Sequence, residues 1–363
     1  MKMDVELSIR KRLGLEIERR IYQNMTAEHP LRQLFWESTL RCNLHCRHCG
    51  SDCKTSACQP DMPREDFLRV LDSIAKRTDP HRVFVVVTGG EPLMRADIAD
   101  CGREIYRRGF PWGMVTNGLF LSERKFNDLL SAGIHTMTVS LDGLKENHNW
   151  MRGHTNSFDR VFEALSMMHE SPLLDYDVVT CVTERNYEEL PRIRDFLIEK
   201  GVKKWRLFTV FPVGRAASDP RMQLVNAHFR GLLDFIKATR SKGLIHASYG
   251  CEGFLGNYES EVRDRFFFCH AGITVGSVLV DGSISSCPSI RADYHQGNIY
   301  ADDFMDVWEK RFFPYRNRDW MRCDECADCK YFRYCHGNGM HLRDGNGKLL
   351  TCHLHRLENA KIS

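Results

Sequence analysis

Residues 41–50 read Arg-Cys-Asn-Leu-His-Cys-Arg-His-Cys-Gly, and they are the strongest clue to the fold. The three thiols are those of Cys42, Cys46 and Cys49. A [4Fe–4S] cluster takes one thiolate per iron, so three cysteines on one short loop leave one iron without a protein ligand. The spacing is neither that of paired zinc ligands nor that of a ferredoxin. It predicts a cluster with one open iron; a structural metal knuckle or three free thiols are the alternatives.

The bulk composition indicates a soluble chain with more than one domain. Its 363 residues exceed the usual size of a single domain, and 42% of them are hydrophobic. The net charge of +3 gives no reason to expect nucleic acid as an obligatory partner. No apolar run approaches the roughly 20 residues of a membrane span, and residues 1–20 lack the apolar segment of a signal peptide. We therefore expect a cytoplasmic protein whose fifteen cysteines serve mainly as metal ligands.

Residues 1–33 have the pattern of a basic helical arm. Apolar residues recur among charges with a roughly helical period up to the break at Pro30, at Leu7, Ile9, Leu13, Leu15, Ile17 and Ile21. The simplest expectation is a helix on the surface of the main domain. The alternative is a docking arm for a partner or substrate.

Residues 34–215 alternate short apolar runs with helical patterns, which predicts six β-α repeats around a parallel sheet. The strands are expected at 34–40, 82–88, 112–116, 136–141, 176–182 and 204–211, and the helices at 64–76, 98–108, 123–132, 158–169 and 187–200. Two arrangements fit this string equally well, a partial (β/α)6 barrel of the TIM type and a doubly wound sheet. Both place binding sites at the C-terminal ends of the strands.

The cysteine loop resembles the signature loop of radical S-adenosylmethionine (SAM) enzymes. The resemblance implies the open six-stranded barrel rather than the doubly wound sheet. It also implies that the open iron of the cluster chelates the amino and carboxylate groups of SAM. The family carries an aromatic residue just before the third cysteine, and His48 occupies that place, where it is expected to lie near the adenine.

Several strand ends match positions at which this family binds SAM. Thr88-Gly-Gly-Glu-Pro92 resembles the second family motif: Gly89 and Gly90 allow close backbone approach, and Glu91 is expected to accept from the SAM amino group. Arg152 suits the SAM carboxylate, because a guanidinium binds a carboxylate with two parallel hydrogen bonds; a surface ion pair is its alternative role. The remaining expected SAM-pocket residues are Asn117 after the third strand, Ser140 and Asp142 for the ribose, and Val182 at the end of the fifth strand.

The C-terminal part of the chain has a different composition. A bridging helix is expected within residues 216–250, and residues 251–355 hold eight cysteines: Cys251, Cys269, Cys287, Cys323, Cys326, Cys329, Cys335 and Cys352. Their spacing resembles that of the SPASM extension, a small α+β domain of radical SAM enzymes that normally carries two auxiliary [4Fe–4S] clusters. Residues 274–280 and 283–287 are expected to form a β-hairpin in it. A zinc ribbon is the alternative for residues 323–335.

The chain departs from the SPASM pattern at one position. The family has a further cysteine four places after Cys335, where this chain has Gly339. Either Cys323 or Cys251 then supplies the missing ligand, or the first auxiliary cluster keeps an open iron that binds substrate. The sequence leaves these alternatives open.

The resemblance implies reductive cleavage of SAM to a 5′-deoxyadenosyl radical, which abstracts hydrogen from a substrate. A low-potential donor of the flavodoxin or ferredoxin type is the implied electron source. Because SPASM enzymes mostly modify ribosomally made peptides or proteins, such a substrate is the main expectation. The alternatives are a tetrapyrrole or other cofactor-synthesis enzyme of the haem-maturation kind and a non-catalytic iron–sulfur electron carrier. No individual catalytic residue is predicted.

Overall fold

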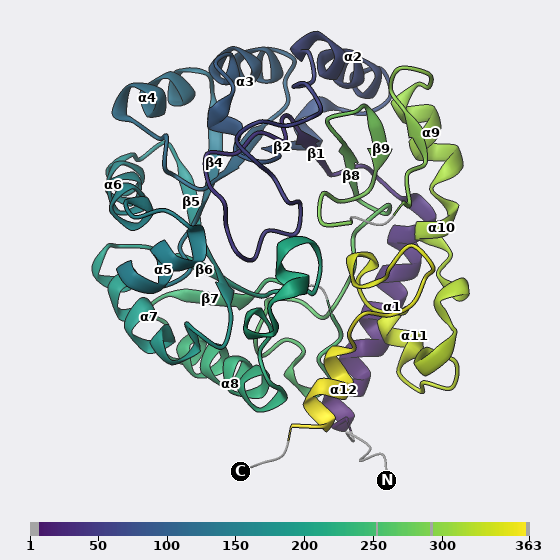
Figure 1. The fold of residues 1–363 in the computed structure, drawn as a ribbon. Helices are drawn as coiled ribbons and strands as arrows, with labels where there is room; N and C mark the ends of the chain where they lie inside the picture. Colours follow the sequence, from purple (N-terminus) through teal and green to yellow (C-terminus); the bar gives the residue numbers. More distant parts are fainter. Residues whose placement is uncertain (1–6, 252, 291–292, 361–363) are drawn as a thin grey trace.

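The computed structural model describes residues 7–251, 253–290 and 293–360. Its centre is a curved sheet in which six neighbouring strands run parallel in chain order, as the sequence predicts (Figure 1). These strands are β1 Gln33–Glu37, β2 Phe84–Thr88, β3 Trp112–Thr116, β4 Ile134–Ser140, β5 Asp175–Val182 and β6 Lys204–Thr209. The α/β partial barrel is thereby confirmed.

Helices cover the outer face of this sheet (Figure 1). They are α2 Arg64–Ala75, α3 Ile98–Arg107, α4 Glu123–Ser131, α6 Ser157–Glu170, α7 Leu190–Glu199 and α8 Asn226–Lys242. The short helix α5 Lys145–Arg152 lies against the cysteine loop, where the Met151 carbonyl accepts from the Arg47 N–H. Side chains alternate along each strand, so Trp36 of β1 points outward and stacks on Phe67 of α2 with ring centroids 4.4 Å apart. Phe35, next to Trp36, lines the inside of the barrel instead.

The C-terminal hairpin continues the barrel sheet. Strand β8 Val275–Val278 pairs in parallel with β1, and β9 Ser283–Ser285 and β10 Gly297–Asn298 follow it. Strand β7 His246–Tyr249, which was not predicted, adds to the other edge beside β6. Within the described residues, the ten strands form one sheet, and the largest hydrophobic cluster includes residues of both parts of the chain. The domain boundaries therefore stay a prediction, because no break in the sheet or core marks them.

The remaining helices lie beside the barrel (Figure 1). They are α9 Phe304–Arg311, α10 Phe313–Arg316, α11 Phe332–Cys335, α12 His353–Glu358 and the long α1 Ile9–Glu28. Residues 1–6 of the expected N-terminal arm lie outside the described residues.

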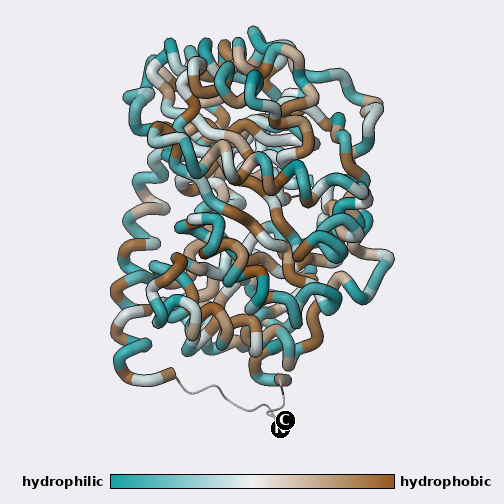
Figure 2. The backbone as a smooth tube through the Cα atoms, turned by 90° about the vertical axis from the view of Figure 1, so that its left-hand side faces the viewer, coloured by the Kyte–Doolittle hydropathy of each residue, from teal (hydrophilic) through white to brown (hydrophobic). Residues whose placement is uncertain are grey.

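Helix α1 packs on C-terminal segments rather than on the barrel. Lys11 Nζ binds Glu261 Oε1 at 3.0 Å, Tyr334 Oη donates to Glu16 at 2.6 Å, and Tyr22 stacks on His336. The apolar residues split between two faces: Leu15 and Tyr22 are buried, whereas Ile9, Leu13, Ile17 and Ile21 are exposed. Figure 2 shows these recurring hydrophobic positions along α1, the long helix at the left edge. No helix in the described part of the chain is both long and apolar enough to cross a membrane.

Candidate active site and auxiliary metal centre

The cysteine loop leaves the C-terminal end of β1 and folds against the loop that follows β2. The Gly90 N–H donates to the Thr39 carbonyl at 2.7 Å, and the Glu91 N–H donates to the Arg41 carbonyl at 2.9 Å. A Cβ at Gly89 would lie 2.1 Å from the Thr39 oxygen, and one at Gly90 would lie 2.3 Å from the Arg41 oxygen. The two glycines therefore allow close approach to the cysteine loop itself, in addition to any contact with a ligand.

The three thiols of this loop lie in one small cluster with Leu44, Cys53 and Leu119. Burial raises the pKa of Cys42 to about 12, whereas the hydrogen bond with Cys53 lowers the pKa of Cys49 below its ordinary value. A metal ligand must be a thiolate, so iron binding here displaces a proton that burial holds on Cys42. Three buried or half-buried thiols at the mouth of the barrel fit a cluster held on three sides.

Glu91 joins the second and third strand ends. One carboxylate oxygen accepts from the Thr116 hydroxyl at 2.7 Å and from the Leu93 N–H at 3.1 Å, and the other accepts from the Asn117 N–H at 2.7 Å. Burial raises the pKa of Glu91 above its ordinary value despite these donors. The Asn117 amide reaches back to Asn43 Oδ1 at 2.8 Å, so Glu91 and Asn117 hold the cysteine loop in place. Direct contact of Glu91 with SAM stays a prediction.

Asp142 and Arg152 form a buried ion pair beside the cluster loop. Arg152 Nη2 lies 2.7 Å from Asp142 Oδ2, and Arg152 Nη1 donates to Cys46 Sγ at 3.7 Å. Burial opposes ionisation of Asp142, but the Arg152 guanidinium lowers the pKa of that carboxyl below its usual range. Arg152 reaches this position because α5, which was not predicted, follows β4 directly. The surface role considered for Arg152 is therefore wrong, since its side chain is 9% exposed.

Some polar atoms in this pocket are left over for a ligand. Arg152 Nε and His48 Nδ1 are among the buried side-chain atoms of the described residues that have no hydrogen-bond partner. His48 Nε2 lies 3.7 Å from Asp142 Oδ2, at the end of β4 where Ser140 is also buried. Buried polar groups normally have partners, so these unused donors and acceptors fit a polar ligand such as SAM.

Val182 does not face this pocket. It is fully buried in the main core, on the same face of β5 as Val178 and Thr180. Its neighbour Cys181 lies on the inner face, with its thiol within 4.8 Å of ligand atoms of His48 and Asp142. The period of two along β5 thus places the Cys181 side chain, rather than that of Val182, on the inner face, and contact of Val182 with SAM stays a prediction.

Arg215 contacts the cysteine loop, although the sequence did not single it out. Its Nε donates to the Cys46 carbonyl at 2.7 Å, and its backbone N–H donates to the Cys49 carbonyl at 3.0 Å. It lies after β6, far along the chain from the cysteine loop, and no spacing rule connects the two segments. Arg215 thereby holds the cysteine loop in place at the mouth of the barrel.

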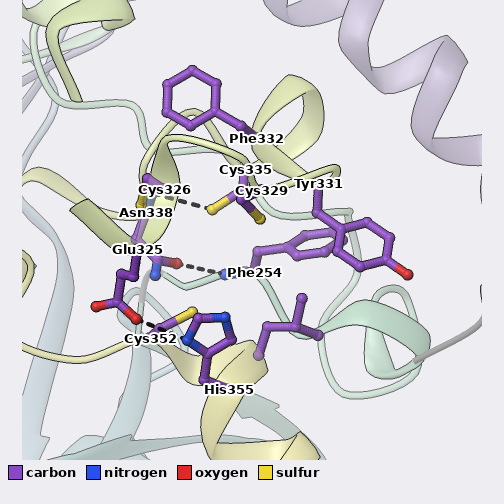
Figure 3. A pocket seen from close by; sticks show the side chains of 11 residues that line it. Phe254, Glu325, Cys326, Cys329, Tyr331, Phe332, Cys335, Asn338, Cys352 and His355 are labelled. Atoms are coloured by element: carbon purple, nitrogen blue, oxygen red, sulfur yellow. Dashed lines mark hydrogen bonds and ion pairs between the residues drawn. The ribbon is translucent and has the colours of Figure 1, made fainter. Parts of the chain in front are cut away.

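Four of the predicted auxiliary ligands come together around one cavity (Figure 3). They are Cys326, Cys329, Cys335 and Cys352. Phe254, Tyr331 and Phe332 line the same cavity, and the Asn338 N–H donates to Cys335 Sγ at 3.2 Å. Burial raises the pKa of Cys335 well above its usual value, and the neighbouring Cys352 raises it further. Four thiols in a mostly apolar surround fit one complete [4Fe–4S] ligand set.

The other predicted auxiliary ligands lie elsewhere. Cys269 precedes β8 and Cys287 follows β9, so both stand at the same end of the hairpin. Cys323 lies outside the four-cysteine cavity, with its sulfur 4.0 Å from Arg343 Nη1. Cys251 lies beside β6, where its sulfur accepts from the Thr209 N–H at 3.1 Å. The alternatives for the Cys269–Cys287 site, completion by Cys251 or Cys323 or an open iron, stay a prediction.

Comparison with known protein families identifies the same two parts of the chain, the barrel and the cysteine-rich region. Residues 36–197 match the model of the radical SAM superfamily, and residues 269–330 match the SPASM iron–sulfur cluster-binding domain. The chain is therefore a radical SAM enzyme with a SPASM domain. Its cofactors are SAM and iron–sulfur clusters, in the barrel and in the auxiliary domain.

Individual relatives are distant but cover most of the chain. An AdoMet-dependent heme synthase of Methanosarcina barkeri is 24% identical over 84% of this chain and 90% of its own length. The mycofactocin maturase MftC of Mycolicibacterium smegmatis is 26% identical over 85% of this chain and 77% of its own. The crystal structure of Streptococcus suis SuiB bound to precursor peptide SuiA has a TM-score of 0.66 and 18% identity, covering 88% of this chain and 74% of that one.

Proposed function

We propose that this enzyme uses its radical to modify a peptide or protein. The observation that carries the proposal is the exposed apolar row on α1, formed by Ile9, Leu13, Ile17 and Ile21. Leu13 and Ile17 are each 63% exposed, and the spacing of four residues places the row along one side of the helix. An exposed row of large apolar side chains is typical of a surface that binds another polypeptide.

The charges beside the row indicate which polypeptide it fits. Arg10, Arg12 and Arg20 of α1 are exposed, whereas Glu16 is already bound by Arg333 and Tyr334. The surface therefore suits an amphipathic segment with apolar anchors and acidic flanks. A tetrapyrrole needs no such row on an outer helix. The likeness to SuiB, which was solved with a precursor peptide, supports the same substrate class.

The residues of the barrel define what the protein contributes to the reaction. When bound together, the cluster and SAM supply a 5′-deoxyadenosyl radical. Arg152 and Asp142 fix the polar side of the pocket, and Glu91 and Asn117 hold the cysteine loop. The surrounding side chains orient the reacting groups and exclude water, because a carbon radical attacks whatever lies nearest.

A tetrapyrrole substrate is the second candidate. Relatives named AdoMet-dependent heme synthase and Fe-coproporphyrin III synthase, both of Methanosarcina barkeri, match 90% and 82% of their own lengths. This coverage favours a tetrapyrrole substrate independently of the α1 surface.

One assay separates the two substrates. Reconstituted enzyme with SAM and dithionite is given either peptides encoded by small reading frames beside its gene or iron coproporphyrin III, and 5′-deoxyadenosine is measured. We expect a peptide to raise deoxyadenosine formation, and Leu13→Glu/Ile17→Glu to remove this stimulation while basal SAM cleavage persists. Leu244→Glu is the matched control, since Leu244 is 61% exposed at the end of α8. Stimulation by iron coproporphyrin III alone would favour the second candidate.

A further inference from the structure

Arg343 is a buried cation whose environment differs from that of Arg95 and Arg152, two buried arginines that form ion pairs. Only 3% of the surface of this residue is exposed. Arg95 and Arg152 are buried to a similar degree, but each is paired with a carboxylate, Asp97 and Asp142 respectively. In the described part of the chain, no carboxylate lies within ion-pair distance of Arg343. A buried charge without a counter-charge is costly, so its presence needs an explanation.

The guanidinium of Arg343 instead contacts two cysteine sulfurs. Nη2 lies 3.5 Å from Cys326 Sγ, and Nη1 lies 4.0 Å from Cys323 Sγ. Its other hydrogen bonds go to main-chain carbonyls of Gly337, Gly347 and Met321. Carbonyls fix its position but carry no net charge.

We propose that Arg343 is the counter-charge of the auxiliary iron–sulfur site and raises the reduction potential of that site. Cys326 is one of the four thiols around the auxiliary cavity. Four thiolates outweigh the positive charge of a cluster core, so the loaded site is anionic and supplies the missing partner of Arg343. Reduction adds a further negative charge, which a nearby cation and N–H···S hydrogen bonds favour.

The position of Arg343 also connects two parts of the cysteine-rich region. Its two terminal nitrogens point to Cys326, inside the four-cysteine cavity, and to Cys323, outside it. The same guanidinium thus influences Cys323 whether or not that thiol is a ligand. Arg343 acts through the ligand sulfurs, which makes it a positioning residue rather than a catalytic one.

The test is a redox titration followed by electron paramagnetic resonance. It uses the full chain with Cys42, Cys46 and Cys49 changed to Ala, so that only auxiliary iron contributes. We expect Arg343→Gln to load as much iron as its parent and to show a more negative potential. Arg343→Lys keeps the charge but not the forked geometry, and its potential should lie between the two. Arg322→Gln is the control, because Arg322 is an exposed residue next to Cys323 and its charge is screened by solvent.

An unchanged potential in Arg343→Gln would overturn the proposal. If Arg343→Gln fails to load iron while Arg343→Lys loads fully, the charge itself is required and the proposal stands. If both variants fail to load and the iron-free proteins also unfold at lower temperature, Arg343 is only a brace for the three carbonyls, and the proposal is wrong.

Discussion

At the scale of single residues, the site depends on buried charges that compensate one another. Asp142 and Arg152 are paired in the interior, and Arg152 also faces the sulfur of Cys46. Removing one member of such a pair leaves the other charge buried without compensation, which costs more than the pair itself contributes. The pair thus serves the fold as well as the ligand pocket.

Replacement of Arg152 should therefore have two separable effects. We expect Arg152→Gln to weaken SAM binding by roughly 1.5–3 kcal/mol, the scale of a lost charge-assisted hydrogen bond. It should also destabilise the fold by roughly 3–5 kcal/mol, much of which Asp142→Asn/Arg152→Gln should recover. Anaerobic calorimetry with SAM measures the first effect and urea unfolding the second. Arg185→Gln, on an exposed arginine, is the control; full SAM affinity in Arg152→Gln would contradict a role in binding SAM.

Asp142 gives the stability a pH dependence of known sign. Burial opposes its ionisation, but Arg152 brings the folded-state pKa of its carboxyl below the usual range. The ionised group therefore stabilises the fold above the unfolded-state pKa of about 3.9, and this contribution disappears as pH falls through the lower folded-state value. The difference in free energy of unfolding between wild type and Asp142→Asn should shrink on acidification below about pH 4. Urea unfolding of iron-free protein at stepped pH measures it, and a growing difference would refute the assignment.

At the scale of elements, the cluster loop depends on close backbone contact with the β2–α3 connection. Gly90→Ala places a Cβ only 2.3 Å from the Arg41 carbonyl oxygen, so one of the two must move. We expect the cysteine loop to move and the barrel site to lose iron, with a loss of stability of about 1–3 kcal/mol. Gly345→Ala is the control, since its added Cβ meets nothing within 4 Å. Normal iron loading in Gly90→Ala would show that the contact is dispensable.

The sequence predicted the elements that have a local signal. A continuous apolar run predicts β2, and a helical period of apolar residues predicts α2. Glu91 and Asp142 could be located because they follow the ends of predicted strands. The pairing of β8 with β1 joins segments about 240 residues apart, and no local pattern encodes it. The α5 helix is short and polar, so only its tertiary position, which buries Arg152, shows its importance.

At the scale of the whole molecule, one sheet joins the barrel, which carries the SAM pocket, to the C-terminal cysteine-rich part. The barrel provides Cys42, Cys46 and Cys49 at its mouth, and the C-terminal segments provide the four-cysteine cavity. Since the two centres use different cysteines, each should assemble without the other. The Cys269–Cys287 site is where the chain departs from the family pattern, because Gly339 stands in place of the usual ligand.

The iron content of the wild type measures how many clusters assemble. We expect about twelve iron and twelve sulfide per chain after anaerobic reconstitution, from three clusters of four irons. Cys323→Ala and Cys251→Ala should then show which thiol completes the Cys269–Cys287 site, through a loss of iron or a changed spectrum. About eight irons would mean that this site is empty, and zinc in the C-terminal cysteines would contradict the auxiliary-cluster assignment.

The most direct test of the account compares the wild type with Cys42→Ala/Cys46→Ala/Cys49→Ala. Iron, sulfide and 5′-deoxyadenosine are measured in both proteins after the same reconstitution. The account predicts that the variant lacks about four irons and forms no deoxyadenosine, while the absorption of its auxiliary iron is retained. Deoxyadenosine formation in the variant, or iron content equal to that of the wild type, would contradict the assignment of these three thiols as the SAM-cleaving centre.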